Sequence, residues 1–128
     1  MADIPGFNPN YMLVKTLSPT GEIVRGYYEY VHGIHAVTPT LGESLPFRAR
    51  PEKICRCTGI QDAESRFVYE HDILLTQSGK LCEVSWNGSN WTMRYADGTV
   101  CDEPGTVCGN LILDEQCRAI FESQKGDG

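Results

Sequence analysis

The segment 81–95 carries the clearest pattern of hydrophobic and polar positions in the chain. Large apolar side chains occupy every second position of its two halves, at Cys82, Val84, Trp86, Trp91, Met93 and Tyr95. Alternation of this kind gives a β-strand one apolar face. The Asn87-Gly88 pair between the halves readily takes positive φ, as a tight hairpin turn requires. The pattern therefore predicts a β-hairpin with Trp86 in cross-strand contact with Trp91.

Other short apolar runs, rich in β-branched and aromatic residues, predict further strands. These runs occupy residues 11–17, 22–31, 34–37, 53–58 and 73–76. The segment 42–51 is expected to be a loop or an edge strand, because Pro46 and Pro51 cannot donate hydrogen bonds to a sheet. Turn residues separate the runs and no internal repeat is visible, a pattern typical of a mainly β fold.

A single helix is predicted near the end of the chain, over 114–123. Cys117, Ile120 and Phe121 recur there at spacings of three and four residues, which gives a helix one apolar stripe. Asp114 lies before the stripe and can cap the first turn. The helix is expected to pack on the sheet through this stripe. The fold class that follows is mainly β (α+β) with one C-terminal helix.

One domain is expected over residues 11–123, because a chain of 128 residues can bury a core without disulfides or metal. Residues 1–10 contain Pro5, Gly6 and Pro9 and show no periodicity, so we interpret them as a flexible N-terminal arm. Residues 124–128 are interpreted as a flexible tail for the same reason.

The net charge of −6 lies almost entirely in the second half of the chain. Residues 1–60 hold six Lys/Arg against five Asp/Glu, a net of +1, whereas residues 61–128 hold five against twelve, a net of −7. Nucleic acids are bound mainly through Lys and Arg at their phosphates. General nucleic-acid binding is therefore disfavoured.

The location expected from the sequence is the cytoplasm. No apolar run approaches the roughly 20 residues that a membrane-spanning helix needs. The segment 1–6 has neither the basic region nor the apolar stretch of a secretory signal. We therefore expect no contact with a membrane.

The only dense group of basic residues is Arg48, Arg50, Lys53 and Arg56. We favour a solvated strand face, because clusters of charge are usually plain surface. The alternative is a ligand site in which these side chains contact phosphate while an aromatic ring stacks on a base. The candidates for that stacking are Tyr27, Tyr28, Trp86 and Trp91.

Six cysteines raise the question of a disulfide or a zinc site, at Cys55, Cys57, Cys82, Cys101, Cys108 and Cys117. Zinc sites usually show paired ligands of the form Cys-x-x-Cys, whereas the only close pair here is Cys55-Arg56-Cys57. On a strand these two thiols face the same side, which suits small buried side chains. A reducing cytoplasm also disfavours disulfides. We therefore prefer buried free thiols and predict neither a metal site nor a cofactor.

Two short motifs stand out between Cys57 and Leu74, reading Thr58-Gly59-Ile60-Gln61-Asp62 and Tyr69-Glu70-His71-Asp72-Ile73-Leu74. They resemble the Thr-Gly-Leu-x-Asp turn and the Ile-Tyr-Glu-Gly-Asp-Ile-Val segment of the YopX-like phage proteins. Gly26-Tyr27-Tyr28 and Cys108-Gly109-Asn110-Leu111-Ile112 are similar to further segments of that family. His71 stands where the family usually has Gly, and the insert 63–65 lacks the usual Asn-Gly pair.

The resemblance implies a phage or prophage gene and a short-stranded β fold, either a strongly bent sheet or a small barrel. It also implies a homo-oligomer, and it supplies no biochemical activity. We interpret the shared residues as structural, because a turn and a strand entry use such residues without any chemistry. These signature residues are Thr58, Gly59, Asp62, Tyr69, Glu70, Asp72, Gly109 and Asn110.

Sequence motifs of common enzyme classes are missing, among them the phosphate-binding loop, the Gly-x-Ser-x-Gly elbow and His-Glu-x-x-His. The leading hypothesis is a small phage or prophage accessory protein, not an enzyme, that acts in the host cytoplasm. It would act by binding as a homo-oligomer, with a host or phage protein as a further partner. One alternative is an anti-defence protein that captures a nucleotide signal or blocks a host nuclease. The other is an acidic mimic of nucleic acid.

Overall fold

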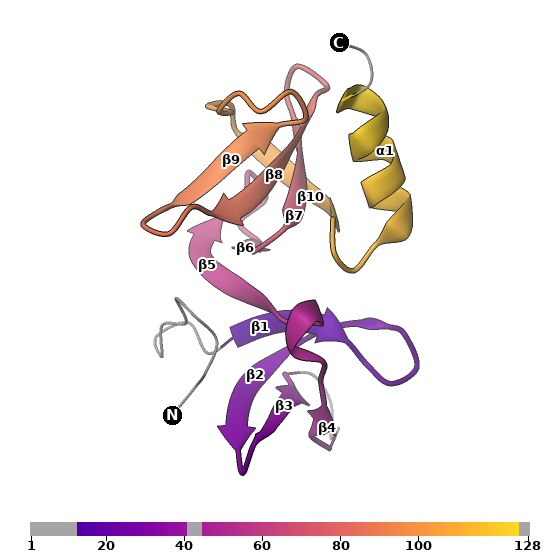
Figure 1. Cartoon of the computed structure of the whole chain (residues 1–128). Coiled ribbons are helices and arrows are strands. Elements are labelled where there is room, and N and C mark those ends of the chain that lie inside the picture. Colours follow the sequence, from indigo (N-terminus) through magenta and orange to yellow (C-terminus); the bar gives the residue numbers. More distant parts are fainter. Residues whose placement is uncertain (1–12, 41–44, 126–128) are drawn as a thin grey trace. The chain divides into compact units, whose positions relative to one another are not determined.

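The computed structural model describes residues 13–40 and 45–125, which form two compact units (Figure 1). The first unit is Met1–Cys57 and the second is Thr58–Gly128. The predicted arm, 1–10, lies outside the described residues, as do residues 126–128 of the predicted tail. That residues 11–123 fold as one domain stays a prediction.

The first unit is an antiparallel sheet with the strand order β4-β3-β2-β1-β5. Its elements are β1 (Leu13–Leu17), β2 (Ile23–Val31), β3 (Ile34–Pro39), β4 (Phe47–Arg48), the 3₁₀ helix η2 (Pro51–Lys53) and β5 (Cys55–Gln61), which continues into the second unit. His32 and Gly33 join β2 to β3 with φ values of 52° and 79°. Two successive positive φ angles match the right-handed twist of a tight hairpin.

One face of β1, β2 and β3 carries the core of the first unit. Its buried residues are Val14, Tyr28, Val37, Ala49 and Ile54. The close packing explains a glycine in β2, because a Cβ at Gly26 would lie 2.5 Å from the Thr38 main-chain oxygen and 2.6 Å from Val37 Cγ1. Since side chains alternate along a strand, the residues between the core positions of β2 point to the opposite face.

The second unit contains a sheet with the order β10-β7-β8-β9, the end of β5 and one helix. Its elements are β6 (Phe67–Tyr69), β7 (Asp72–Thr76), β8 (Leu81–Trp86), β9 (Trp91–Tyr95), β10 (Gly105–Asn110) and α1 (Glu115–Lys125). Strand β6 pairs with β5. Cys117 and Phe121 of α1 are buried against Ile73, Leu81 and Ala96, so the helix packs on this sheet.

The hairpin predicted over 81–95 is confirmed. Trp86 of β8 pairs with Trp91 of β9, and their rings meet edge to face with centroids 5.0 Å apart. In the loop, the Asn87 side-chain oxygen accepts the amide hydrogens of Ser89 and Asn90, each at 2.8 Å. Gly88 has a φ of 100°, as the predicted turn requires.

The predicted fold class is confirmed at the level of a mainly β chain with two antiparallel sheets and one C-terminal helix. Helix α1 ends two residues later than predicted, and Gln124, assigned to the tail, accepts the Leu81 amide hydrogen at 3.1 Å. Asp114 caps α1 as predicted, accepting the Cys117 amide hydrogen at 3.1 Å. None of the helices in the described ranges is long and apolar enough to span a membrane.

The sheets formed by the described residues are open, so the small barrel predicted as one alternative is not observed there. Strand β4 has only two residues and is flanked by Pro46 and Pro51, which cannot extend the ladder. Strand β9 is covered by the chain that follows it through main-chain hydrogen bonds. The Tyr95 amide donates to the Thr99 carbonyl oxygen, and the Cys101 amide donates to the Met93 carbonyl oxygen. Short and covered edges end a sheet without closing it.

Candidate functional site

Asp72 and Asn110 form a buried polar pair at the start of β7 and the end of β10, and the two residues are 0% and 1% exposed. Asn110 Nδ2 donates to Asp72 Oδ1 over 2.8 Å and to the Glu70 main-chain oxygen over 3.0 Å. The other Asp72 oxygen accepts the Tyr69 amide hydrogen at 2.7 Å. The pair thus ties the turn between β6 and β7 to the end of β10.

Asn110 also shapes the chain that leads into α1. Its Oδ1 accepts the amide hydrogens of Ile112 and Leu113 at 3.0 and 3.2 Å. The preceding Gly109 lies against the helix, because a Cβ at this position would be 2.5 Å from Cys117 Sγ. The Gly-Asn pair therefore has a structural use at each of its two positions.

His71 adopts the backbone conformation that a glycine would take most easily, with a φ of 67°. Main-chain hydrogen bonds hold this conformation: His71 donates to the Val84 oxygen, and Leu111 donates to the His71 oxygen, each at 2.7 Å. The imidazole Nδ1 lies 2.8 Å from Glu83 Oε2, and Nε2 lies 3.8 Å from Glu70 Oε2. The turn thus keeps a positive φ although histidine replaces the glycine of the resembling motif.

Asp62 closes the loop between β5 and β6 and fastens it to β10. Its Oδ1 accepts the amide hydrogens of Glu64 and Arg66, each at 2.9 Å. Its Oδ2 accepts the Val107 amide hydrogen at 3.0 Å and lies 3.1 Å from Arg66 Nε. Burial opposes ionisation, but the amide hydrogens of Val107, Arg66 and Glu64 outweigh it and hold the Asp62 pKa below its ordinary value.

The loop at Asp62 also covers the free edge of β10. Ala63 donates to the Gly105 oxygen at 3.0 Å, and the Arg66 guanidinium donates to the Val107 oxygen at 3.0 Å. Main-chain groups of an exposed edge strand would otherwise be open to pairing with another chain. The side chain of Arg66 and the main chain of Ala63 thus protect a sheet edge.

Thr58 and Gly59 begin the same segment. The Thr58 hydroxyl donates to the Val68 oxygen at 2.8 Å and accepts the Ile60 amide hydrogen at 3.0 Å. Gly59 has a φ of 80°, which a residue with a Cβ adopts at a cost. These contacts, like those of Asp62 and Asp72, are made to the chain itself and suit a structural role.

The four basic residues of the alternative ligand site are not gathered on one exposed surface. Arg56 lies in β5 and is only 5% exposed. Arg48 is exposed on the short edge strand β4, and Lys53 is half-buried at the end of η2. Arg50 is exposed and its Nε lies 2.7 Å from Glu52 Oε1. The geometry therefore offers no convergent set of four cations for a phosphate.

Five of the six cysteines are buried and Cys108 is exposed; all six are free thiols. Cys55 and Cys57 are both buried in β5, as predicted from their spacing. In the described part of the chain, no group of three or more His, Cys, Asp or Glu side chains is placed to hold a metal ion.

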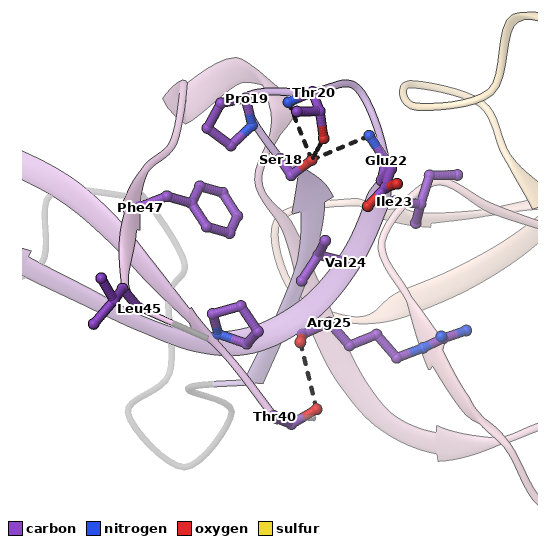
Figure 2. A pocket seen from close by; sticks show the side chains of 11 residues that line it. Ser18, Pro19, Thr20, Glu22, Ile23, Val24, Arg25, Thr40, Leu45 and Phe47 are labelled. Atoms are coloured by element: carbon purple, nitrogen blue, oxygen red, sulfur yellow. Dashed lines mark hydrogen bonds between the residues drawn. The ribbon is translucent and has the colours of Figure 1, made fainter. Parts of the chain in front are cut away.

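The first unit contains a pocket of about 500 Å³ between the β1–β2 turn and the start of β4 (Figure 2). Figure 2 shows the Phe47 ring pointing towards Val24 and Pro19, which gives the pocket apolar walls. On its rim, the Ser18 hydroxyl accepts the amide hydrogens of Thr20 and Glu22 at 3.3 and 3.2 Å. None of the signature residues lines this pocket. Its apolar walls suit the binding of an apolar group better than catalysis.

The second unit contains a polar network that the sequence did not indicate. The Tyr95 hydroxyl donates to Glu103 Oε2 at 2.7 Å, and the Ser78 hydroxyl donates to the same oxygen at 2.8 Å. These hydrogen bonds lower the pKa of Glu103. Tyr95, with Lys80 and Asp97, also lines a pocket of about 480 Å³. Partners that lie 8 and 25 residues from Glu103 leave no local signal in the sequence.

Comparisons with known proteins identify no relative of this chain. No protein-family model matches it, and no curated protein matches it.

Proposed function

We propose that the chain is a small phage or prophage accessory protein that acts by binding, as a homo-oligomer, and not by catalysis. The proposal includes the YopX-like fold, expected from the resemblance of the signature residues, and a place in the host cytoplasm, expected because the sequence shows neither a secretory signal nor a membrane-spanning run. The observation that carries it is the outer face of β2 and β3, where large apolar side chains are exposed opposite a well-packed core.

The outer face is defined by alternate residues of β2 and by the start of β3. Tyr27 at its centre is 58% exposed, and Ile23, Val31 and Ile34 are also exposed. Val31 and Ile34 are paired across the hairpin, so their side chains lie together. Exposed apolar residues gathered on one face are typical of an interaction surface.

A second copy of the chain is the partner that best fits the charges on this outer face. Arg25 and Glu29 are exposed and lie two residues before and after Tyr27 on the same face of β2. In a two-fold arrangement with Tyr27 against Tyr27, Arg25 would face Glu29 of the partner subunit. The surface is thus self-complementary, as a two-fold interface between identical subunits requires.

A charge exchange tests this arrangement. Arg25→Glu and Glu29→Arg are each expected to weaken self-association about tenfold, because each places like charges opposite one another. The double variant Arg25→Glu/Glu29→Arg restores opposite charges and is expected to recover association. Size-exclusion chromatography with light scattering over a concentration series measures the change.

Glu122→Arg, on the exposed side of α1, serves as the matched control and should associate like the wild type. A wild-type chain that stays monomeric at micromolar concentration would refute the homo-oligomer. If the chain associates but the double variant behaves as badly as the single ones, the two-fold pairing at Tyr27 is wrong and another face makes the contact.

A second candidate function, an acidic mimic of nucleic acid, is favoured by the distribution of charge. The two units divide after Cys57, and residues 58–60 carry no charge. The net charge is therefore +1 in the first unit and −7 in the second. Acidic side chains exposed on the second unit include Glu64, Asp97, Asp102, Glu115 and Glu122. Nucleotide capture gains no such support, because Arg56 is buried away from the other basic residues.

Capture of a host protein distinguishes the acidic mimic from self-association. The mimic predicts one basic host partner that elutes as salt is raised, because screening weakens contacts between charges. The double variant Glu115→Lys/Glu122→Lys should retain less of that partner, whereas Glu52→Lys in the first unit should retain it fully. Equal retention by both variants would argue against the mimic.

A further inference from the structure

Two pairs of cysteines lie together in the second unit. Cys82 and Cys101 belong to one buried cluster and are 1% and 7% exposed. Cys108 and Cys117 form the other pair, in which Cys117 is buried and Cys108 is exposed. Solvent can therefore reach one thiol of the second pair, Cys108, but neither thiol of the first pair.

The local backbone explains why Cys108 faces outward. Val107 pairs with Leu74 and Gly109 pairs with Ile73, so Cys108 is an extra residue in β10 with no partner in β7. Such a β-bulge re-aims the side chain of the extra residue. Cys108 therefore lies at the surface, next to Gly109, where Cys117 of α1 contacts the strand.

Cys117 approaches Cys108 from the first turn of α1. Its sulfur lies against Gly109, because a Cβ on that glycine would be only 2.5 Å from Cys117 Sγ. The Cys117 thiol is also close enough to lower the pKa of Cys108, by hydrogen bonding to its sulfur once that is ionised. The buried Cys117 sulfur therefore lies against the residue that follows Cys108 in β10, while Cys108 itself is open to solvent.

We propose that Cys108 and Cys117 form a reversible thiol–disulfide exchange site for low-molecular-weight disulfides such as glutathione disulfide. The Cys108 thiol loses its proton to solvent, and the thiolate attacks one sulfur of the small disulfide. The disulfide bond breaks and its other half leaves as a thiol after taking up a proton.

The second step completes the exchange within the chain. The Cys117 thiol loses a proton, attacks the Cys108 sulfur of the mixed disulfide and displaces the second small thiol. Two protein thiols are oxidised to one disulfide, and one small disulfide is reduced to two small thiols. The new bond would fasten the start of α1 to β10.

The order of the steps follows from the electrostatics of the pair. Partial desolvation raises the pKa of the exposed Cys108 thiol, and burial raises that of Cys117 to about 12; the nearby Asp114 carboxylate adds to both effects. The hydrogen bond from Cys117 offsets part of the rise at Cys108, so Cys108 ionises first. Exchange should therefore be slow at neutral pH and accelerate by about tenfold for each unit of pH below the Cys108 pKa.

The test is incubation of the full-length folded chain with glutathione disulfide, followed by acid quenching, alkylation of the remaining thiols after unfolding, and peptide mapping. The expected result is a Cys108–Cys117 disulfide, formed faster as pH rises, with Cys82 and Cys101 fully alkylated. Cys82 and Cys101 serve as an internal control, because they are close together but buried.

Two variants separate the steps. Cys117→Ser should stop at a stable glutathione adduct on Cys108, and Cys108→Ser should form neither the adduct nor the disulfide. Since Cys117→Ser alters a buried position, Cys108→Ser at the exposed position keeps the test decisive if the first variant fails to fold. A wild-type chain that remains unmodified, stops at the adduct, or links Cys82 to Cys101 instead would overturn the proposal, which does not depend on self-association or on the acidic mimic.

Discussion

An Asp72→Asn protein is expected to unfold with a free energy about 2 kcal/mol lower than that of the wild type. The carboxylate accepts hydrogen bonds from the Tyr69 amide and from the Asn110 side chain and is wholly buried. An asparagine at this position has one acceptor oxygen and an amide group that can only donate. Either the Tyr69 amide or the Asn110 side-chain amide would then face another donor, at a position that solvent does not reach.

Urea unfolding, followed by tryptophan fluorescence, measures this change. The reciprocal variant Asp72→Asn/Asn110→Asp is the matched control, because it exchanges donor and acceptor between the same two positions. It should recover about half of the lost stability. The hydrogen bond between side chains 72 and 110 returns, but the Glu70 main-chain oxygen loses the hydrogen bond that the Asn110 side-chain amide donates to it. An Asp72→Asn protein that keeps wild-type stability but loses the proposed binding activity would instead make Asp72 a functional carboxylate.

The hairpin could be predicted because its signal is local. Two strands with apolar residues at alternate positions, joined by an Asn-Gly turn, specify both the faces and the register. The observed pairs Trp86–Trp91 and Val84–Met93 follow from that pattern alone. The helix was predicted for the same reason, since the spacing of Cys117, Ile120 and Phe121 is fixed by the helical repeat.

The contacts of the signature residues could not be predicted, because their partners are far away in the sequence. Asp72 and Asn110 are 38 residues apart, and Asp62 reaches the Val107 amide across 45 residues. The sequence indicated that Asp62 would close its own turn, which the bonds to Glu64 and Arg66 do. It carried no sign that the same carboxylate also holds the edge of β10.

Charge along the sequence was a poor guide to a shared surface. Arg56 is close in sequence to Arg50 and Lys53, yet it lies in the interior between two buried cysteines of β5. Alternation on a strand places Arg56 on the face opposite to Cys55 and Cys57. Both faces of β5 are covered at this point, so the sequence pattern alone could not show which residues are exposed.

An Asp62→Ala protein is expected to lose about 2–3 kcal/mol of stability. The side chain is fully buried, and its replacement removes the carboxylate that accepts from three main-chain amides, those of Glu64, Arg66 and Val107. The loop would then no longer cover the edge of β10. We expect faster amide hydrogen exchange at Val107 together with the drop in stability, and greater self-association of the partly opened strand edge.

The pH dependence of Asp62→Asn separates the charge from the shape of this side chain. The pKa of Asp62 is held below its ordinary value in the folded chain, so the carboxylate stabilises the fold above pH about 4. That contribution is lost as the pH falls through the folded-state pKa. The difference in unfolding free energy between wild type and Asp62→Asn should therefore shrink in acid, as measured by urea unfolding at a series of pH values.

Asp97→Ala is the control for both Asp62 variants, because Asp97 also closes a turn by accepting the amide and hydroxyl hydrogens of Thr99. Asp97 is exposed, so water can replace the lost acceptor and the effect on stability should be much smaller. An equal loss for Asp62→Ala and Asp97→Ala would mean that each aspartate acts only within its own turn. The contact between Asp62 and Val107 would then add nothing, and the protection of the β10 edge would have to come from Ala63 and Arg66 alone.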